Sequence, residues 1–571
     1  VLDGASITAT LSVRTITGEI GTSTTKFPGK FSSITSDGNV TVGWKLTGAL
    51  TLESSDTLTI PSTNNLTFTN SSDENIKIGY GISNNITDSS QSILIGYESG
   101  KNLTSSSINN TFLGWNSGRD TTGIWNTFIG HRSGQVNTTS SYNTFVGSSA
   151  GRTNTGSSNT FIGTMSGMSN TTGEYNTFMG TMCFSSNTTG NRNCGFGYGA
   201  GKLSADVINN VYIGYYSGYN NNGGYNTFIG CESGYGVWGI PPNSSVNNTF
   251  IGHKSGYSIR TGSDNVFVGL NSGYNNTTGF RNTFLGRGSG YSNSIGNKDI
   301  FIGFRSGYSN TIGYSNAFIG EESGYSNIAG DFNTFIGGGS GYSNTYGDYN
   351  IFIGEQSGYS NTVSSKIVCI GYQAGYSNTA TENIYIGYKA GYDNMYGVLN
   401  TYIGYTSGEN NTGSYNTYIG NGVASTAGNA QYNTFVGAQS GNSVISASYG
   451  AYLGYQSGYS VTTGQSNVFI GRHSGYSTTT GYDNSFLGLN SGKFNTTGYQ
   501  NLCAGASSGY YWSSKCIIRG LGWMGECGRQ WQYKGWVRSR SLFIRNKFWK
   551  LQHIYRIGCG SGPGPHLYFI W

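Results

Sequence analysis

Short hydrophobic segments recur along most of the chain at one spacing. Each reads Asn-Thr-Phe-Ile or a close variant and ends in glycine, and Ser, Asn, Thr, Tyr and Gly fill the interval to the next copy. The closing glycine occurs 26 times from Gly79 to Gly505. Of the 25 intervals between these glycines, 18 are 17 residues long, as from Gly320 to Gly337. Six others are one residue shorter or longer, and the longest, from Gly230 to Gly252, is 22 residues. Such self-similarity is typical of repeat architectures, so we expect one structural unit per copy.

Each unit predicts one coil of β structure. About 17 residues are too few for a helical repeat, which needs about 30 or more, and the alternation within Asn-Thr-Phe-Ile is typical of a strand. Glycine and asparagine adopt positive φ at low cost, so the closing glycine and an Asn-Thr-x-Gly segment predict two corners. Stacked coils would place parallel strands about 4.8 Å apart. The expected fold is an all-β parallel β-roll or β-solenoid of about 26 coils, without helix in residues 75–510.

Stacking would set like residues above one another. We number the positions of a coil 1 to 17, so that residues 333–349 form one unit and its first residue, Asn333, is position 1. Asparagine holds position 1 in most coils, and stacked asparagines can form a hydrogen-bonded ladder. N-glycosylation is the alternative, because Asn-x-Ser/Thr recurs along the chain. The pattern favours the ladder.

The same alternation predicts association between chains. It places the threonine and isoleucine of the strand on one side and the aromatic residue on the other. If isoleucine fills the coil, an aromatic stripe lies outside it, and soluble monomers rarely expose so long an apolar patch. Identical chains arranged about a common axis would bury it. A homotrimer suits a round shaft best and a dimer stays open; the predicted trimer core contains Phe301, Phe318, Phe335 and Phe352.

Two features suggest surface contacts. A row of tyrosines follows Ser-Gly in the unit and includes Tyr308, Tyr325 and Tyr342. These rings could stack on sugars along the shaft, or pack over their neighbours at a corner. The longest interval contains an insertion with Trp238, and insertions in solenoids form loops that often bind partners. Trp238 is therefore a candidate contact residue.

Composition limits the classes of function. Charged residues make up 10% of the chain against a typical ~25%, and aromatic residues, at 14%, exclude the disordered class. The net charge of +6 comes from residues 511–571, which hold ten Lys/Arg and one acid, a net +9, and leave −3 for residues 1–510. The body therefore lacks the basic stripe of a nucleic-acid-binding protein. No apolar run reaches the length that a membrane span needs, so no membrane insertion is expected.

No catalytic, cofactor-binding or metal-binding constellation emerges. The eight cysteines show neither metal spacing nor a disulfide framework. His131, His253 and His473 follow strand ends at variable, exposed positions, and no Ser, His and Asp set recurs. Calcium-binding β-rolls need aspartate in each turn, where this chain has asparagine and threonine. We expect a protein that is not an enzyme and has no cofactor.

The two ends depart from the repeat. Residues 1–74 show short strands and polar turns, which suggests an attachment region or a cap that blocks growth of the stack. The chain opens without methionine or a signal peptide, as in a processed or partial product. Residues 511–571 are basic, hold six of the ten tryptophans and lack aspartate. They are either a binding tail or a product of a shifted reading frame, which turns glycine codons into tryptophan codons; the second interpretation, or a degenerate terminus, is favoured.

Units such as Tyr-Asn-Thr-Phe-Ile-Gly-x-x-Ser-Gly-Tyr-x-Asn-Thr-Thr-Gly resemble the repeats of bacteriophage and large-virus tail fibres. They are more distantly similar to the heads of trimeric autotransporter adhesins. The resemblance covers about residues 75–510. It implies a left-handed β-roll of three chains and a role in surface attachment. The expected function is a structural and adhesive fibre, extracellular or on a virion, that binds itself and a cell-surface glycan or receptor. The alternatives are a self-assembling filament without receptor and an ice- or glycan-surface binder.

Overall fold

The computed structural model describes residues 75–86, 90–236, 243–426 and 428–510, and the backbone of a two-residue strand at 517–518. Trp238, the region 1–74 and the rest of the tail 511–571 lie outside the described residues. The described residues contain 27 β-strands and no helix, which confirms the predicted class.

All strands except the last span three residues, and each opens one coil. Their bounds are β1 (Ile76–Ile78), β2 (Ile93–Ile95), β3 (Thr111–Leu113), β4 (Thr127–Ile129), β5 (Thr144–Val146), β6 (Thr160–Ile162), β7 (Thr177–Met179), β8 (Cys194–Phe196), β9 (Val211–Ile213), β10 (Thr227–Ile229), β11 (Thr249–Ile251), β12 (Val266–Val268), β13 (Thr283–Leu285), β14 (Ile300–Ile302), β15 (Ala317–Ile319), β16 (Thr334–Ile336), β17 (Ile351–Ile353), β18 (Val368–Ile370), β19 (Ile384–Ile386), β20 (Thr401–Ile403), β21 (Thr417–Ile419), β22 (Thr434–Val436), β23 (Ala451–Leu453), β24 (Val468–Ile470), β25 (Ser485–Leu487), β26 (Leu502–Ala504) and β27 (Ile517–Ile518).

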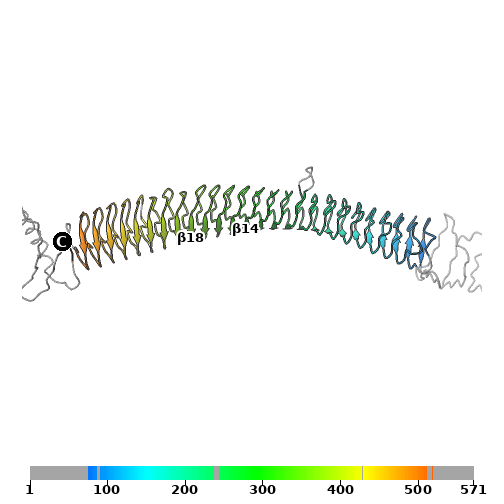
Figure 1. Ribbon diagram of the computed structural model, residues 1–571, viewed down its shortest axis with the longest axis horizontal. Coiled ribbons are helices and arrows are strands. Elements are labelled where there is room, and N and C mark those ends of the chain that lie inside the picture. Colours follow the sequence, from blue (N-terminus) through cyan, green and yellow to red (C-terminus); the bar gives the residue numbers. More distant parts are fainter. Residues whose placement is uncertain (1–74, 87–89, 237–242, 427, 511–516, 519–571) are drawn as a thin grey trace, which may run out of the picture. The chain divides into compact units, whose positions relative to one another are not determined.

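The strands form one parallel ladder. Each pairs with the next strand in the chain, with equivalent positions opposite one another, as in Phe318 opposite Phe335 and Ile319 opposite Ile336. Figure 1 shows the coils as one row, in which β14 and β18 mark the middle part. This arrangement confirms the predicted parallel β-solenoid with one coil per repeat. The left hand of the winding and the number of chains stay predictions.

The aromatic row fills the coil, and this reverses the predicted orientation of the strand. The rings of Phe301, Phe318, Phe335 and Phe352 are fully buried within a single chain, with 0% exposure. They stack at centroid distances of 4.9, 4.7 and 4.8 Å. The prediction that they lie between chains is therefore wrong. Isoleucine and threonine, expected inside, point outward.

The reason for this orientation lies across the coil from the strand. Position 9 is glycine in most coils, and a Cβ on Gly341 would lie 2.5 Å from the ring of Phe335. The space left by the missing side chain is thus the space that the aromatic ring occupies. Alternation along a strand separates two faces but does not say which one is inside. The small residues opposite the strand decide it.

Polar ladders complete the interior, as the asparagine pattern predicted. At position 1, the backbone N–H of Asn333 donates to Oδ1 of Asn316 at 2.9 Å, and Nδ2 of Asn333 donates to the carbonyl of Gly347 at 2.8 Å. At position 12, Nδ2 of Asn344 donates to Oδ1 of Asn327 at 2.8 Å. Because buried polar groups are costly without partners, these bonds are what allows asparagine inside the coil. Buried apolar residues replace asparagine at position 12 in some coils; they are Ile259, Val444 and Val461.

The two predicted corners have different origins. Gly337, at position 5, has a φ of +128°, and a Cβ there would lie 2.6 Å from the backbone of Gly354 in the next coil. Gly347, in the Asn-Thr-x-Gly segment, has no positive φ; its Cβ would lie 2.3 Å from the carbonyl oxygen of Ser364. Gly337 is thus needed both for its positive φ and because the next coil lies too close for a side chain. Gly347 is needed only because the next coil lies too close.

Candidate functional surfaces

The outer face of the strands is an uncharged, largely apolar surface that runs along the described coils. It consists of positions 2 and 4, which carry threonine, valine, isoleucine, leucine or other uncharged residues from β1 to β26. We call it the strand face. Fourteen of its large apolar side chains are 36% to 53% exposed; they are Ile78, Ile93, Leu113, Phe196, Ile251, Val266, Ile300, Ile319, Ile351, Ile384, Leu453, Ile470, Leu487 and Leu502.

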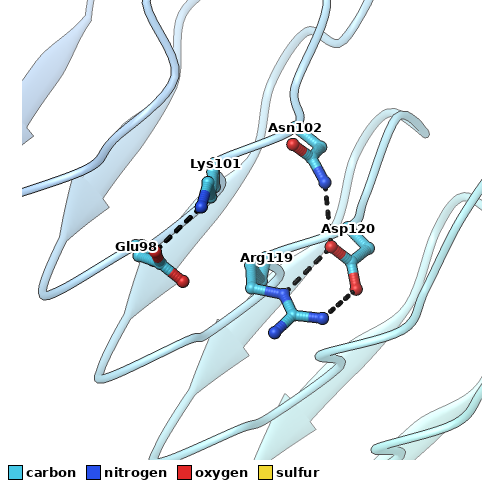
Figure 2. Close-up of polar contacts among 5 residues, drawn as sticks. All are labelled: Glu98, Lys101, Asn102, Arg119 and Asp120. Carbon is cyan, nitrogen blue, oxygen red and sulfur yellow. Dashed lines mark hydrogen bonds and ion pairs between the residues drawn. The ribbon is translucent and has the colours of Figure 1, made fainter.

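Charged side chains gather beside this face rather than on it. In the N-terminal coils, Lys101 pairs with Glu98 at 2.8 Å, and Arg119 binds both carboxylate oxygens of Asp120 at 3.0 and 2.7 Å (Figure 2). Nδ2 of Asn102 donates to the same aspartate from the preceding coil at 2.9 Å. These residues hold positions 7, 10 and 11. Such exposed pairs contribute little stability, but they make this edge hydrophilic.

The tyrosines at position 10 form a continuous stack on the same edge. Eleven rings from Tyr219 to Tyr392 follow one another at centroid distances of 4.9 to 5.3 Å. Tyr308, Tyr325 and Tyr342, the predicted sugar contacts, lie within this stack and are half-buried. Burial raises the pKa of Tyr342 above its ordinary value. The faces of these rings cover one another, so a ligand meets only their edges and hydroxyl groups.

A cation lies near the terminal ring at each end of this stack. Nζ of Lys202 lies 5.9 Å from the ring of Tyr219, and Nζ of Lys389 lies 4.9 Å from the ring of Tyr392. The terminal rings thus have cation–π contacts, and the inner rings have both faces covered by neighbouring tyrosines. The geometry therefore favours the second of the two interpretations given above, in which the tyrosines pack over their neighbours.

A different aromatic row has free ring faces, and the sequence alone did not single it out. Position 17 precedes the strand and carries Trp125, Tyr142, Tyr175 and Tyr225 in the N-terminal coils. These side chains are 54%, 61%, 59% and 58% exposed. No stacked ring, cation or side-chain hydrogen-bond partner contacts them within the described part of the chain. The sequence does contain a sign of this row, because several units carry an aromatic residue directly before Asn-Thr-Phe.

Many glycosylation sequons of the described coils are inaccessible, which weakens the alternative explanation of the asparagine pattern. Asn137, Asn170, Asn187, Asn276 and Asn495 all precede x-Ser/Thr and are buried in the coil. Asn247 and Asn410 are exposed and keep their side chains at the surface.

The side chains that could carry chemistry are dispersed. Among the described residues, no three His, Cys, Asp or Glu side chains gather closely enough to hold a metal ion. Cys183 and Cys369 are buried, and burial raises the pKa of both thiols. His473 lies near Asn490 with its Nδ1 3.3 Å from Oδ1, and burial lowers the pKa of its imidazole. None of these groups meets a second one that would activate it.

No family model matches the chain, and no curated protein is significantly similar to it. The part of the chain that the structure describes also holds no helix that is long and apolar enough to cross a bilayer. Function is therefore inferred from the surfaces of the solenoid.

Proposed function

We propose that this chain is the shaft of a structural and adhesive fibre, displayed on a virion or another extracellular surface and assembled from several copies of the chain. The strand face carries this proposal. It is uncharged in every coil from β1 to β26, while charged side chains flank it on other positions. Such a face is suited to burial between proteins rather than to contact with water.

The size of the strand face supports association. Twenty-six coils at a strand spacing of about 4.8 Å give a length of roughly 120 Å, and two side chains across a strand span roughly 7 Å. The resulting area of roughly 800 Å² equals what one partner buries in a standard stable interface. A second copy is the natural occupant, because it presents the same rows at the same spacing. The resemblance to viral fibres favours three copies.

The strand-face proposal is tested by matched aspartate substitutions. Ile300, Ile319 and Ile351 lie on the strand face and are 43%, 36% and 39% exposed. Replacing all three with aspartate should place charges inside the interface and reduce the assembly to monomers, as measured by analytical ultracentrifugation. The control replaces apolar side chains of the turn at position 14, which are similarly or more exposed, with aspartate; they are Ile295, Ile312 and Val363.

The control variant should assemble like the parent, and circular dichroism should show the same β signal in all three proteins. A parent protein that is a folded monomer would overturn the proposal, as would assembly that persists in the strand-face variant. The mass of the parent assembly distinguishes a trimer from a dimer.

Electron microscopy separates the fibre from the filament. Discrete rods of uniform length with a free tip support an attachment fibre. Rods that join end to end into long filaments support a mechanical filament without a receptor.

A further inference from the structure

The aromatic side chains at position 17 differ in their surroundings along the shaft. In the C-terminal coils, Tyr415, Tyr432 and Tyr449 stack on one another at 4.8 and 5.2 Å, so that both faces of Tyr432 are covered. In the N-terminal coils, Ser158 separates Tyr142 from Tyr175, and Arg192 and Asn209 separate Tyr175 from Tyr225. Trp125 and Tyr142 lie in adjacent coils, but their rings do not stack on one another. Trp125, Tyr142, Tyr175 and Tyr225 therefore keep free faces, as described above.

We propose that Trp125, Tyr142, Tyr175 and Tyr225 form a binding platform for a linear, uncharged polysaccharide that lies along the shaft. The inference rests on the proposed adhesive function and names the class of ligand. The C–H groups of a sugar ring pack against an aromatic face, and tyrosine and tryptophan add a polar edge that bonds hydroxyl groups. The platform spans six coil steps, or roughly 29 Å at about 4.8 Å per coil, which suits a chain of several sugars.

The backbone holds these four rings in place. Each residue adopts a positive φ, between 57° and 62°, and its N–H donates to a carbonyl of the preceding coil, as Tyr142 does to Ile124 at 3.1 Å. Ladder bonds of this kind repeat along the shaft, so the side chains project from a rigid corner. Fixing the site before the ligand arrives lowers the entropic cost of binding.

The composition of the platform favours a glycan over a protein. Polar residues interrupt the row between Tyr142 and Tyr225, so the four rings form no continuous apolar patch, unlike the strand face. Ser141 and Ser157 at position 16 place hydroxyl groups beside the rings, and both accept a hydrogen bond from the backbone of the preceding coil. Their own hydroxyl protons can therefore be donated to a sugar. Glu174 and Arg192 supply one charge of each sign, which gives no preference for a charged polysaccharide.

Affinity electrophoresis of the full chain tests the platform. Native gels contain hydroxyethyl cellulose, galactomannan or dextran as neutral probes, and heparin as the charged probe. We expect retardation by at least one neutral polysaccharide. Replacing the four platform residues with alanine should weaken it at least tenfold, whereas replacing the three tyrosines with phenylalanine, with Trp125 kept, should preserve most of it. The matched control, Y415A/Y432A/Y449A, removes stacked tyrosines at the same coil position and should bind like the parent.

Several outcomes would overturn the platform. These are no retardation by any neutral polysaccharide, equal losses in the platform and control variants, and binding of heparin alone. Analytical ultracentrifugation of the alanine variant supplies the remaining outcome: if assembly is lost with binding, the rings contact a second copy of the chain and not a glycan. Failure of the fibre proposal is seen separately, as a parent protein that stays monomeric.

Discussion

Asp299 is an acidic residue in a row of amides. It holds position 1, is fully buried, and accepts hydrogen bonds at Oδ1 from the backbone N–H and Nδ2 of Asn316. Its Oδ2 accepts from Nδ2 of Asn293 and Asn310 at 3.2 and 3.3 Å. Burial nevertheless raises the pKa of this carboxyl group well above its ordinary value, since the donors are neutral amides and Asp331 adds a like charge.

We expect Asp299→Asn to raise the free energy of unfolding at neutral pH by about 1–3 kcal/mol, the usual cost of a buried polar group whose partners do not satisfy it. A raised folded-state pKa means that the folded protein binds the proton more tightly than the unfolded chain. The wild type therefore loses stability as pH rises above the unfolded pKa of about 3.9 through the raised folded value. Melting temperatures of both proteins from pH 3 to pH 8 should converge at the acidic end. A gap that does not change with pH would contradict this account.

At the scale of one element, β8 shows that a coil can depart from the repeat sequence as long as its interior stays filled. Its central residue is Gly195, where other strands carry an aromatic ring, and the preceding coil carries Phe184 in place of the usual glycine at position 9. The ring of Phe184 takes the vacant place and stacks between Phe178 and Tyr212 at 4.5 and 5.3 Å. Two departures from the repeat thus restore the same continuous column.

A double-mutant cycle tests this compensation. Gly195→Phe alone should be strongly destabilising, because a Cβ on Gly195 would lie 2.7 Å from Cδ2 of Phe184, the ring that the second substitution removes. Phe184→Gly alone empties the column and should cost about 3–5 kcal/mol, as other large-to-small aromatic changes do. The double variant recreates the usual pattern and should lie close to the wild type. Chemical denaturation of the four proteins measures the coupling, and additive losses would show that the two positions are independent.

On the scale of the whole molecule, the solenoid is a one-dimensional array. Each strand pairs only with its neighbours in the chain, and hydrogen bonds between coils join residues about one repeat apart. Stability in such arrays is approximately a sum over coils and their interfaces. The length of the shaft can therefore change without a change of fold. The shorter and longer intervals between closing glycines, Gly230–Gly252 among them, are tolerated for the same reason.

Deletion of residues 333–349 should leave a folded shaft one coil shorter. The deletion joins Phe332 to Asn350 and brings β15 against β17 with every row preserved. We expect an unchanged β signal in circular dichroism and a melting temperature within a few degrees of the wild type. Deletion of residues 333–341 alone is the control. It removes part of a coil, sets unlike positions above one another and should destabilise the protein markedly.

The sequence by itself determined the coil and its repetition. The spacing of the closing glycines predicted the number of coils, and rows such as Asn316 and Asn333 predicted the buried ladder, because stacking at one repeat length sets equal residues in contact. Only the tertiary structure decided which side of the strand is inside. Phe335 points inward because Gly341 leaves room across the coil, a contact between residues of two walls that alternation within one strand cannot reveal. The same holds for the tyrosines, since exposure of Tyr142 and stacking of Tyr342 depend on their neighbours in adjacent coils.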